Sequence, residues 1–317
     1  MTFAINADMV RDAARRIVPL ARRTPVLTSR SLDDRAGLSL FLKCENFQRG
    51  GAFKIRGASN LILSLTPDQL TRGVVAFSSG NHAQATAIAA RHVGATATIV
   101  MPHDAPRSKM EATRAQGATI VTYNRFTEDR EAVAARIVAE TGAVLVPPFD
   151  HPLVMAGQGT AALELMEEIP DLDALLVCVG GGGLLSGSAT IAKDIRPAIR
   201  VFGVEPELAS DAARSLAAGE RIAIPPPDTI ADGLRTPVTG KLAFPIIRHH
   251  VEAILTVSED EIRAAMRLVI ERMKMIIEPS SAVTVAAAIS GRLPAGISRL
   301  GLVISGGNVD LDFLKTL

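Results

Sequence analysis

The sequence has only two cysteines, and it lacks both long charge runs and long apolar runs. Cys44 and Cys178 each lie inside an apolar segment, so we interpret them as buried thiols, and the sequence supports neither a disulfide framework nor a zinc site. Basic and acidic residues number 34 and 33 and are interspersed, unlike a nucleic-acid-binding tail or a polybasic membrane patch. No segment approaches the roughly 18 apolar residues of a membrane span. The first residues are charged early, unlike a signal peptide. We therefore expect a cytoplasmic enzyme with no nucleic-acid or membrane partner.

Short β-rich segments alternate with alanine-rich helical segments, and almost half of the chain is hydrophobic at 48%. The predicted strands are 73–77, 96–101, 118–122, 174–179, 200–204 and 300–304. The predicted helices are 82–92, 106–116 with Pro106 at a favourable early position, 127–140, one from about Leu184, and an amphipathic helix near 264–272. This alternation favours an α/β fold with mostly parallel, covered sheets, in which ligands bind beyond the carboxyl ends of the strands.

Three segments that contain glycine follow predicted strands. In the tetraglycine loop (Gly180 to Gly183), backbone N–H groups can approach an anion closely at the start of a helix, which predicts a phosphate site. A plain turn is the alternative, but four successive glycines lose much chain entropy on folding. The segment 78–82 (SSGNH) also opens a helix, although Ser79 or Asn81 there would equally suit a helix cap. The segment 305–308 (SGGN) is a weak signal alone.

Lys54 lies between two apolar residues in the segment 50–57 (GGAFKIRG). A desolvated lysine has a lowered pKa and forms a Schiff base with a carbonyl cofactor. Taken alone, this lysine would be read as a solvated charge at a helix end.

The segment 46–58 (NFQRGGAFKIRGA) resembles the Schiff-base segment of the serine/threonine dehydratase and serine racemase family, which are pyridoxal-phosphate enzymes of the tryptophan-synthase-β fold type. The segments 78–82, 156–160 (AGQGT), 180–183, 278–279 (EP) and 305–308 recur in the family's order, so the likeness covers essentially the whole chain. It implies two three-layer αβα domains with the cofactor in the cleft between them. Residues 1–70 and 149–317 would form the large cofactor-binding domain, and residues 71–148 the small mobile domain.

The resemblance also implies roles for individual residues. Lys54 would hold pyridoxal 5′-phosphate as an internal aldimine and later remove the α-proton of the substrate. The cofactor would be bound by Phe53, Lys54, Asn81, Gly180, Gly181, Gly182, Gly183, Leu184, Glu278 and Ser305. The substrate would be bound by Ser78, Ser79, Gly80, Asn81 and His82. Ser79 matches the second, opposite-face base of serine racemases, although dehydratases carry this serine too. Ser305 would face the pyridine nitrogen, where a neutral hydroxyl leaves that nitrogen less protonated than an aspartate would.

Two further correspondences lie outside these motifs. Glu205, the carbonyl of Ala209 and Asp211 match a divalent-cation site of racemase-like members, and their hard oxygens suit Mg²⁺ or Ca²⁺. Alternatively, Glu205 only ends a strand and Asp211 faces water. Arg130 matches a racemase arginine near the mouth of the active site, but a surface helix charge explains it equally well.

The implied function is a homodimeric pyridoxal-phosphate ammonia-lyase that converts L-threonine, L-serine or both to a 2-oxo acid and ammonia by β-elimination. Serine racemase and 3-hydroxyaspartate dehydratase are alternatives. Ala52, where many dehydratases have serine, matches the racemase and hydroxyaspartate branch, whereas Phe149 matches threonine dehydratases.

Two other classes of protein compete with this interpretation. A nicotinamide-dependent oxidoreductase is suggested by Gly181-x-Gly183 after a strand, with Glu205 about 20 residues later. However, the third glycine, Gly187, falls one position late, and Lys54 would have no role. Lys54 also argues against a non-catalytic protein that binds phosphate or an amino acid.

Overall fold

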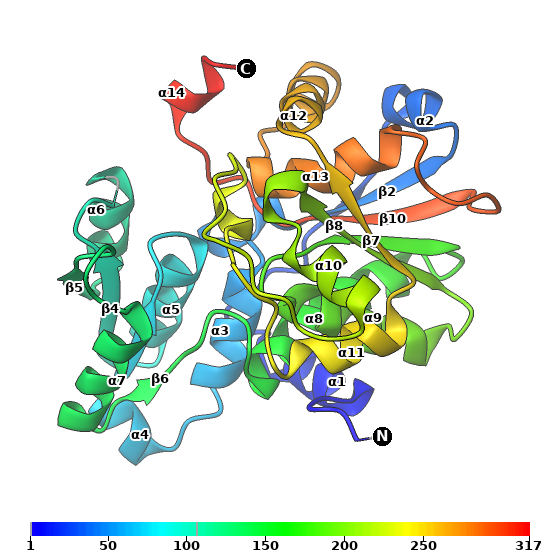
Figure 1. Ribbon diagram of the computed structural model, residues 1–317. Coiled ribbons are helices and arrows are strands. Elements are labelled where there is room, and N and C mark those ends of the chain that lie inside the picture. The colour runs from blue at the N-terminus through cyan, green and yellow to red at the C-terminus, as the bar shows by residue number, and fades with distance from the viewer. Residues whose placement is uncertain (1, 106) are drawn as a thin grey trace.

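The computed structural model describes residues 2–105 and 107–317, whose strands form two sheets (Figure 1). The strands are β1 (Val26–Leu27), β2 (Ser39–Cys44), β3 (Val74–Phe77), β4 (Ala97–Pro102), β5 (Thr119–Tyr123), β6 (Val144–Leu145), β7 (Ala174–Cys178), β8 (Arg200–Pro206), β9 (Ala253–Val257) and β10 (Arg299–Ile304). One sheet has the order β1-β2-β10-β7-β8-β9 and the other β5-β4-β3-β6. All neighbouring strands are parallel except β1, which is antiparallel to β2.

Helices connect these strands. The α-helices are α1 (Ala7–Arg16), α2 (Arg30–Ala36), α3 (Lys54–Ile62), α4 (Pro67–Arg72), α5 (Asn81–His92), α6 (Arg107–Ala115), α7 (Arg130–Thr141), α8 (Pro152–Glu168), α9 (Gly183–Ile195), α10 (Asp211–Ala218), α11 (Ala243–His250), α12 (Glu259–Met273), α13 (Pro279–Ile289) and α14 (Leu311–Leu314). Short 3-10 helices are η1 (Glu45–Phe47), η2 (Arg49–Gly51), η3 (Glu207–Ala209) and η4 (Asp232–Leu234). Among the described residues, no helix is both long and apolar enough to cross a membrane.

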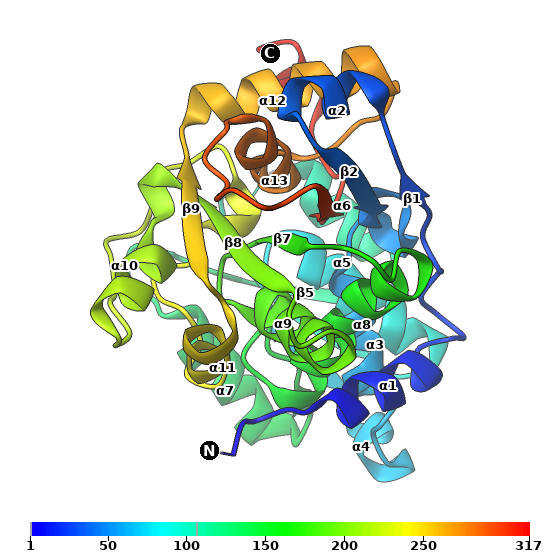
Figure 2. The same cartoon turned by 90° about the vertical axis from the view of Figure 1, so that its right-hand side faces the viewer.

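Each sheet is covered by helices on both faces, which gives two three-layer αβα arrangements, as the family resemblance implied. Figure 2 shows α2, α12 and α13 on one face of the six-stranded sheet and α8, α9 and α11 on the other. Along β3 the faces alternate, because Val74 and Ala76 pack in the cluster that contains α3 and α5, whereas Val75 and Phe77 pack against α7. The fold class predicted from the sequence is therefore confirmed.

The expected strands correspond to β3, β4, β5, β7, β8 and β10, with differences of at most two residues at either end. The helix expected at 127–140 begins instead at Arg130, because the side chain of Asp129 accepts the N–H groups of Glu131 and Ala132 and caps the helix there. Pro106, expected early in a helix, lies outside the described residues, and α6 is described from Arg107.

A buried ion network holds α3, the helix that begins at Lys54, against the six-stranded sheet. The fully buried Arg56 guanidinium donates to both carboxylate oxygens of Glu45, at 2.7 and 2.8 Å, and to both of Glu164, at 2.8 Å each. Lys43 of β2 reaches Glu164 at 2.6 Å. Because these charges are paired and hydrogen-bonded, they can remain ionised inside the protein, and the start of α3 is fixed relative to β2 and α8.

Candidate active site

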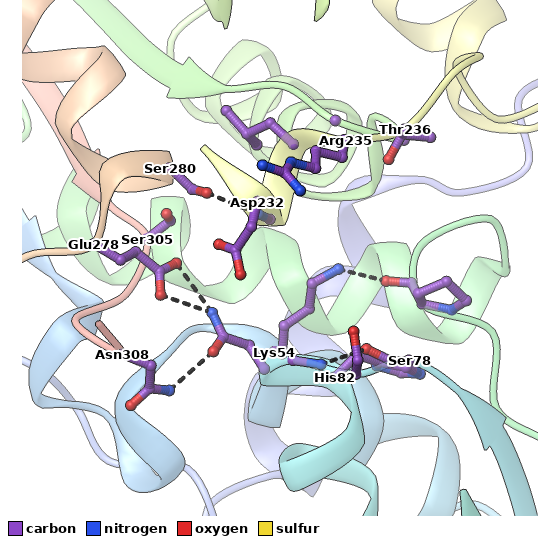
Figure 3. Close-up of a pocket in the computed structure, with 18 of the residues that line it drawn as sticks. Lys54, Ser78, His82, Asp232, Arg235, Thr236, Glu278, Ser280, Ser305 and Asn308 are labelled. Carbon is purple, nitrogen blue, oxygen red and sulfur yellow. Dashed lines mark hydrogen bonds between the residues drawn. The ribbon is translucent and has the colours of Figure 1, made fainter. Parts of the chain in front are cut away.

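A cavity of about 890 Å³ lies between the carboxyl ends of strands from the two sheets. Its wall includes the segments that follow β3, β7 and β10, together with the first residue of α3 (Figure 3). The carboxyl ends of parallel strands are the usual location of ligand sites in α/β proteins. The cavity therefore brings together all four segments that the sequence singled out.

Lys54 is the first residue of α3, and its side chain extends into this cavity. The amine donates a hydrogen bond to the carbonyl of Pro148 at 2.7 Å and lies 5.2 Å from the centre of the Phe53 ring. Burial lowers the pKa of Lys54 to about 8, and Cys178 and Glu278 partly oppose that shift. About a tenth of the amine is therefore unprotonated at pH 7, far more than for an ordinary lysine, and this is the form that a nucleophile or base requires.

The tetraglycine loop joins β7 to α9 on another wall of the cavity. From Gly180 to Leu184, the backbone N–H groups donate no hydrogen bond to the described part of the chain. Gly182 has φ +89°, and a Cβ on Gly181 would lie 2.3 Å from the Phe149 ring, so side chains are disfavoured at both positions. The loop therefore exposes unpaired donors at the start of α9, an arrangement that fits a phosphate group.

A second group of unpaired donors lies between β3 and α5. The N–H groups of Ser79, Asn81 and His82 have no acceptor among the described residues, and this segment lines the same cavity. The alternative role of Ser79 or Asn81 as a helix cap does not hold, because the N-cap of α5 is Gly80 and no side chain caps the first turn. The open turn leaves the donors available for a small anion such as a carboxylate.

The Asn81 side chain is held by two residues from distant parts of the chain. Its amide nitrogen lies 3.0 Å from each carboxylate oxygen of Glu278, and its oxygen accepts from Asn308 at 2.9 Å. Burial raises the pKa of Glu278 to about 7, although the Asn81 hydrogen bond opposes this shift. Asn308 belongs to the segment 305–308, but no local pattern in the sequence indicates its contact with Asn81.

His82 is a neutral side chain in the wall of the cavity. Its Nε2 lies 2.8 Å from the carbonyl of Val146, and burial lowers its pKa to about 3. Nδ1 is buried and has no hydrogen-bond partner in the part of the chain that the structure describes. With Nε2 donating to the carbonyl, Nδ1 carries a lone pair.

The segment after Pro225 contributes unexpected charged residues. Asp232 and Arg235, which follow the three successive prolines 225–227, line the cavity, opposite His82 and Asn308 in Figure 3. Lys109 of α6 contacts Asp232 at 2.5 Å, which joins the two sides of the cavity. Arg130 also lines it, with its guanidinium 5.5 Å from the centre of the Phe77 ring.

The expected cation ligands lie outside this cavity. Glu205 ends β8 and is fully buried. One of its carboxylate oxygens accepts from the N–H of Ala213, and the other has no partner among the described residues. Burial raises the pKa of Glu205 to about 9 and that of Asp211 to about 6. Asp211 is buried and does not face water. In the described ranges no three histidine, cysteine or acidic side chains are grouped to hold a metal, so the site would use two carboxylates and the Ala209 carbonyl.

The burial of Glu205 also bears on the dinucleotide alternative. That interpretation required the Glu205 carboxylate to meet a ribose beside the glycine-rich loop. A side chain with no exposed surface cannot do so.

The comparisons with known proteins agree with this geometry. Residues 17–306 match the model of a family described as pyridoxal-phosphate dependent enzymes. An L-threo-3-hydroxyaspartate ammonia-lyase from Saccharomyces cerevisiae is 49% identical over 97% of this chain and 94% of its own length. A maize serine racemase structure has a TM-score of 0.96 at 45% identity and covers 99% of this chain and 97% of its own.

A serine racemase structure from Dictyostelium discoideum has a TM-score of 0.93 at 45% identity, over 97% of this chain and 100% of its own. Threonine deaminase structures are also similar to this chain, one of them with a TM-score of 0.91 at 46% identity, over 96% of this chain and 99% of its own. Relatives described by three different activities thus resemble this chain over nearly its full length. The chain belongs to the serine/threonine dehydratase and serine racemase family of pyridoxal-phosphate-dependent enzymes, and its cofactor is pyridoxal phosphate.

Proposed function

We propose that the protein is an ammonia-lyase that converts L-threonine, L-serine or both to a 2-oxo acid and ammonia. The observation that carries this proposal is the Lys54 amine, with its pKa lowered to about 8, in a cavity that has unpaired backbone donors on two walls. One set of donors suits the phosphate of the cofactor and the other the carboxylate of an amino acid.

The residues proposed to hold the cofactor all lie on the cavity wall. They are Phe53, Lys54, Asn81, Gly180, Gly181, Gly182, Gly183, Leu184, Glu278 and Ser305. When bound, pyridoxal phosphate supplies a carbonyl group for the lysine amine and an electron sink for the carbanion of the substrate. The glycine N–H groups would bind the phosphate, and the Asn81 amide, held by Glu278 and Asn308, would face the ring substituents.

The other residues act on the substrate. The N–H groups of Ser79, Asn81 and His82 would bind its carboxylate, with the Ser78 hydroxyl and Gly80 completing that turn. The unprotonated Lys54 amine would then accept the α-proton, and its low pKa keeps it available near neutral pH. The Ser79 hydroxyl makes no hydrogen bond to the described residues and would be the base on the opposite face in a racemase.

A panel of five substrates tests the proposed function. We expect kcat/KM for 2-oxo acid release to be higher for L-threonine or L-serine than for the L-threo and D-threo isomers of 3-hydroxyaspartate. It should also exceed kcat/KM for the racemisation of serine. Each reaction is followed by 2-oxo acid formation and by chiral chromatography of the remaining amino acid, with D-serine as the fifth substrate. Faster racemisation than elimination would make the protein a serine racemase, and preference for a hydroxyaspartate would identify the second candidate.

That second candidate, a 3-hydroxyaspartate ammonia-lyase, is favoured by the cations of the cavity wall. Lys109 is paired with Asp232, and Arg125 with Asp104 at 2.7 Å. Arg235 is held differently, since its Nε donates to the carbonyl of Thr229 at 2.7 Å. Among the described residues, its terminal nitrogens have only the Asp228 carboxylate nearby, at 3.8 Å. A guanidinium positioned in this way can bind a second carboxylate on the β-carbon of a substrate.

We further propose that Glu205, the Ala209 carbonyl and Asp211 bind Mg²⁺ or Ca²⁺. The unpartnered carboxylate oxygen of Glu205 supports this, because a cation would satisfy a buried acceptor that otherwise costs stability. At about 100 times its Kd, the cation would add roughly 2.7 kcal/mol to the free energy of unfolding. Tm measured by calorimetry should therefore rise by several degrees with MgCl₂ or CaCl₂ after EDTA treatment. The variant Glu205→Gln should lose that rise, and an unchanged wild-type Tm would contradict the site.

Three other expectations stay predictions. The division into a large domain (1–70 and 149–317) and a small mobile domain (71–148) is supported by the placement of the four-stranded sheet within 74–145. The homodimer and the cytoplasmic location are carried over from the family resemblance and the composition.

A further inference from the structure

The segment 156–160 (AGQGT) has no part in the proposed function, although it is one of the motifs that the sequence shares with the family. It lies in the middle of α8, and all five of its residues are buried. The helix α8 packs against α3, whose first residue is Lys54. Three residues of the segment, Gly157, Gln158 and Thr160, contact Arg56 or Gly57 of α3.

The helix α3 begins without a capping side chain of its own. Its N-cap is Phe53, whose ring is no acceptor for the N–H groups of the first turn. One of these groups, the N–H of Gly57, donates instead to Oε1 of Gln158 at 3.2 Å. Gln158 is 1% exposed, which shields this hydrogen bond from water. A side chain of α8 therefore does for α3 what a capping residue does for other helices.

Two glycines allow the helices to approach each other this closely. A Cβ on Gly57 would lie 2.5 Å from Nε2 of Gln158. A Cβ on Gly157 would lie 2.6 Å from the carbonyl oxygen of Arg56. Side chains on a helix lean toward its N-terminus, and residues three positions apart share a face. The Gln158 amide therefore lies on the face of α3 that carries Lys54.

The Gln158 amide has a single orientation. Its Oε1 faces the N–H of Gly57, because the flipped amide would set two donors against each other. Nε2 is then a donor, and it has no hydrogen-bond partner among the described residues. Gln158 also lines the cavity into which Lys54 extends. A negative charge placed at Nε2 would therefore act on the Lys54 amine.

We propose that Gln158 is a positioning residue that caps the first turn of α3 through Gly57 and so holds the Lys54 amine where it reaches the carbonyl of bound pyridoxal phosphate. The proposal rests on the catalytic role of Lys54 in the proposed function, but on no particular substrate. Gln158 acts through the backbone of α3 and takes no part in bond making. Without it, the first turn of α3 opens more often, and the amine is less often placed for attack.

The rate of covalent cofactor attachment tests this placement, because attachment requires Lys54 but no substrate. The variant Gln158→Met keeps the length of the side chain and loses the acceptor for the Gly57 N–H. With full-length apoprotein, at the pH where the rate levels off, we expect attachment to be at least about tenfold slower than in the wild type. Amide hydrogen exchange at Gly57, followed by NMR of the holoenzyme, should be at least about fivefold faster.

The conservative variant Gln158→Glu keeps an oxygen for the Gly57 N–H. Exchange at Gly57 and the plateau rate of attachment should therefore match those of the wild type. Its second oxygen replaces Nε2, and an opposite charge beside the amine favours the protonated lysine, so the rate should level off at a higher pH than in the wild type. A plateau rate as low as that of Gln158→Met would overturn the proposal.

The variant Leu163→Ala controls for a general loss of stability, because it removes buried methyl groups from the same helix. It should lower Tm without slowing attachment. Wild-type attachment in a folded Gln158→Met variant, or equal slowing in Leu163→Ala, would contradict the positioning role.

A shorter side chain replaces Gln158→Met if that variant does not fold. In Gln158→Asn the acceptor is one methylene too short to reach Gly57, and the same slow attachment is expected. Attachment at the wild-type rate in Gln158→Asn would count against the proposal. None of these measurements uses a substrate, so failure of the proposed lyase activity would be seen separately in the substrate panel.

Discussion

Replacing Lys54 by alanine is expected to abolish covalent attachment of the cofactor and to lower kcat/KM for elimination by at least about 10³-fold. The variant loses both the nucleophilic amine and the proposed base. It should still fold, because within the described part of the chain the only side-chain hydrogen bond lost is the one to the carbonyl of Pro148. Borohydride reduction followed by mass spectrometry of the labelled peptide measures attachment, and 2-oxo acid release measures turnover.

The variant Lys54→Arg separates the charge of the lysine from its reactivity. It keeps a cation at this position, but a guanidinium does not lose its proton in proteins. We expect it to be as inactive as Lys54→Ala, whereas alanine at the exposed Lys315, whose amine pairs with Asp312, should leave attachment unchanged. Turnover near the wild-type level in either Lys54 variant would contradict the catalytic role.

The lowered pKa of Lys54 adds a pH dependence to the same experiment. Only the unprotonated amine attacks a carbonyl, so cofactor attachment to the apoprotein should accelerate about tenfold per pH unit below the pKa. Because burial places that pKa at about 8, the rate should level off above about pH 8. A rate that keeps rising to pH 10, as for an ordinary lysine, would mean that the amine is solvated.

The sequence predicted those parts of the site that depend on local signals. The glycine segments after β3, β7 and β10 were recognisable because each follows a short apolar run and opens a turn or helix. The sequence did not predict β2, which pairs with β10 over its whole length, because Lys43 interrupts its apolar run. Inside the protein, the amine of that lysine pairs with Glu164 of α8, about 120 residues away, and donates to the carbonyl of Thr24. The sequence around β2 does not indicate the Glu164 partner.

Side-chain directions that depend on long-range packing could not be predicted. The Ser281–Ser305 contact requires α13 to pack beside the end of β10, and the Asn81–Glu278 contact joins residues 197 positions apart. Arg235 follows a proline-rich loop that resembles any exposed connection. Its direction depends on the carbonyl of Thr229, which periodicity does not reveal.

For Arg235, the expected result is a change in substrate preference. If its guanidinium binds the β-carboxylate of a substrate, Arg235→Ala should lower kcat/KM for L-threo-3-hydroxyaspartate by roughly 10- to 150-fold, which corresponds to the loss of a charged hydrogen bond worth about 1.5–3 kcal/mol. L-serine has no second carboxylate, so its kcat/KM should stay within about threefold of the wild type. The ratio of the two values, measured by 2-oxo acid release, is the quantity that the variant changes.

Two further variants show whether this change comes from contact or from charge. Arg235→Lys keeps a point charge but loses the planar pair of donors, so its preference should lie between those of the wild type and Arg235→Ala. Arg248→Ala removes the same charge from α11, where the guanidinium donates to the carbonyl of Gly219, and it should leave the ratio unchanged.

An equal loss of kcat/KM for both substrates in Arg235→Ala would mean that Arg235 only supports the η4 loop. A lower ratio in Arg248→Ala would mean that the net field of the protein, and not a contact with Arg235, attracts the dicarboxylate. A loss of kcat/KM that occurs in Arg235→Ala but not in Arg248→Ala, and only for the dicarboxylic substrate, would show that the Arg235 side chain sets the preference for hydroxyaspartate over serine or threonine.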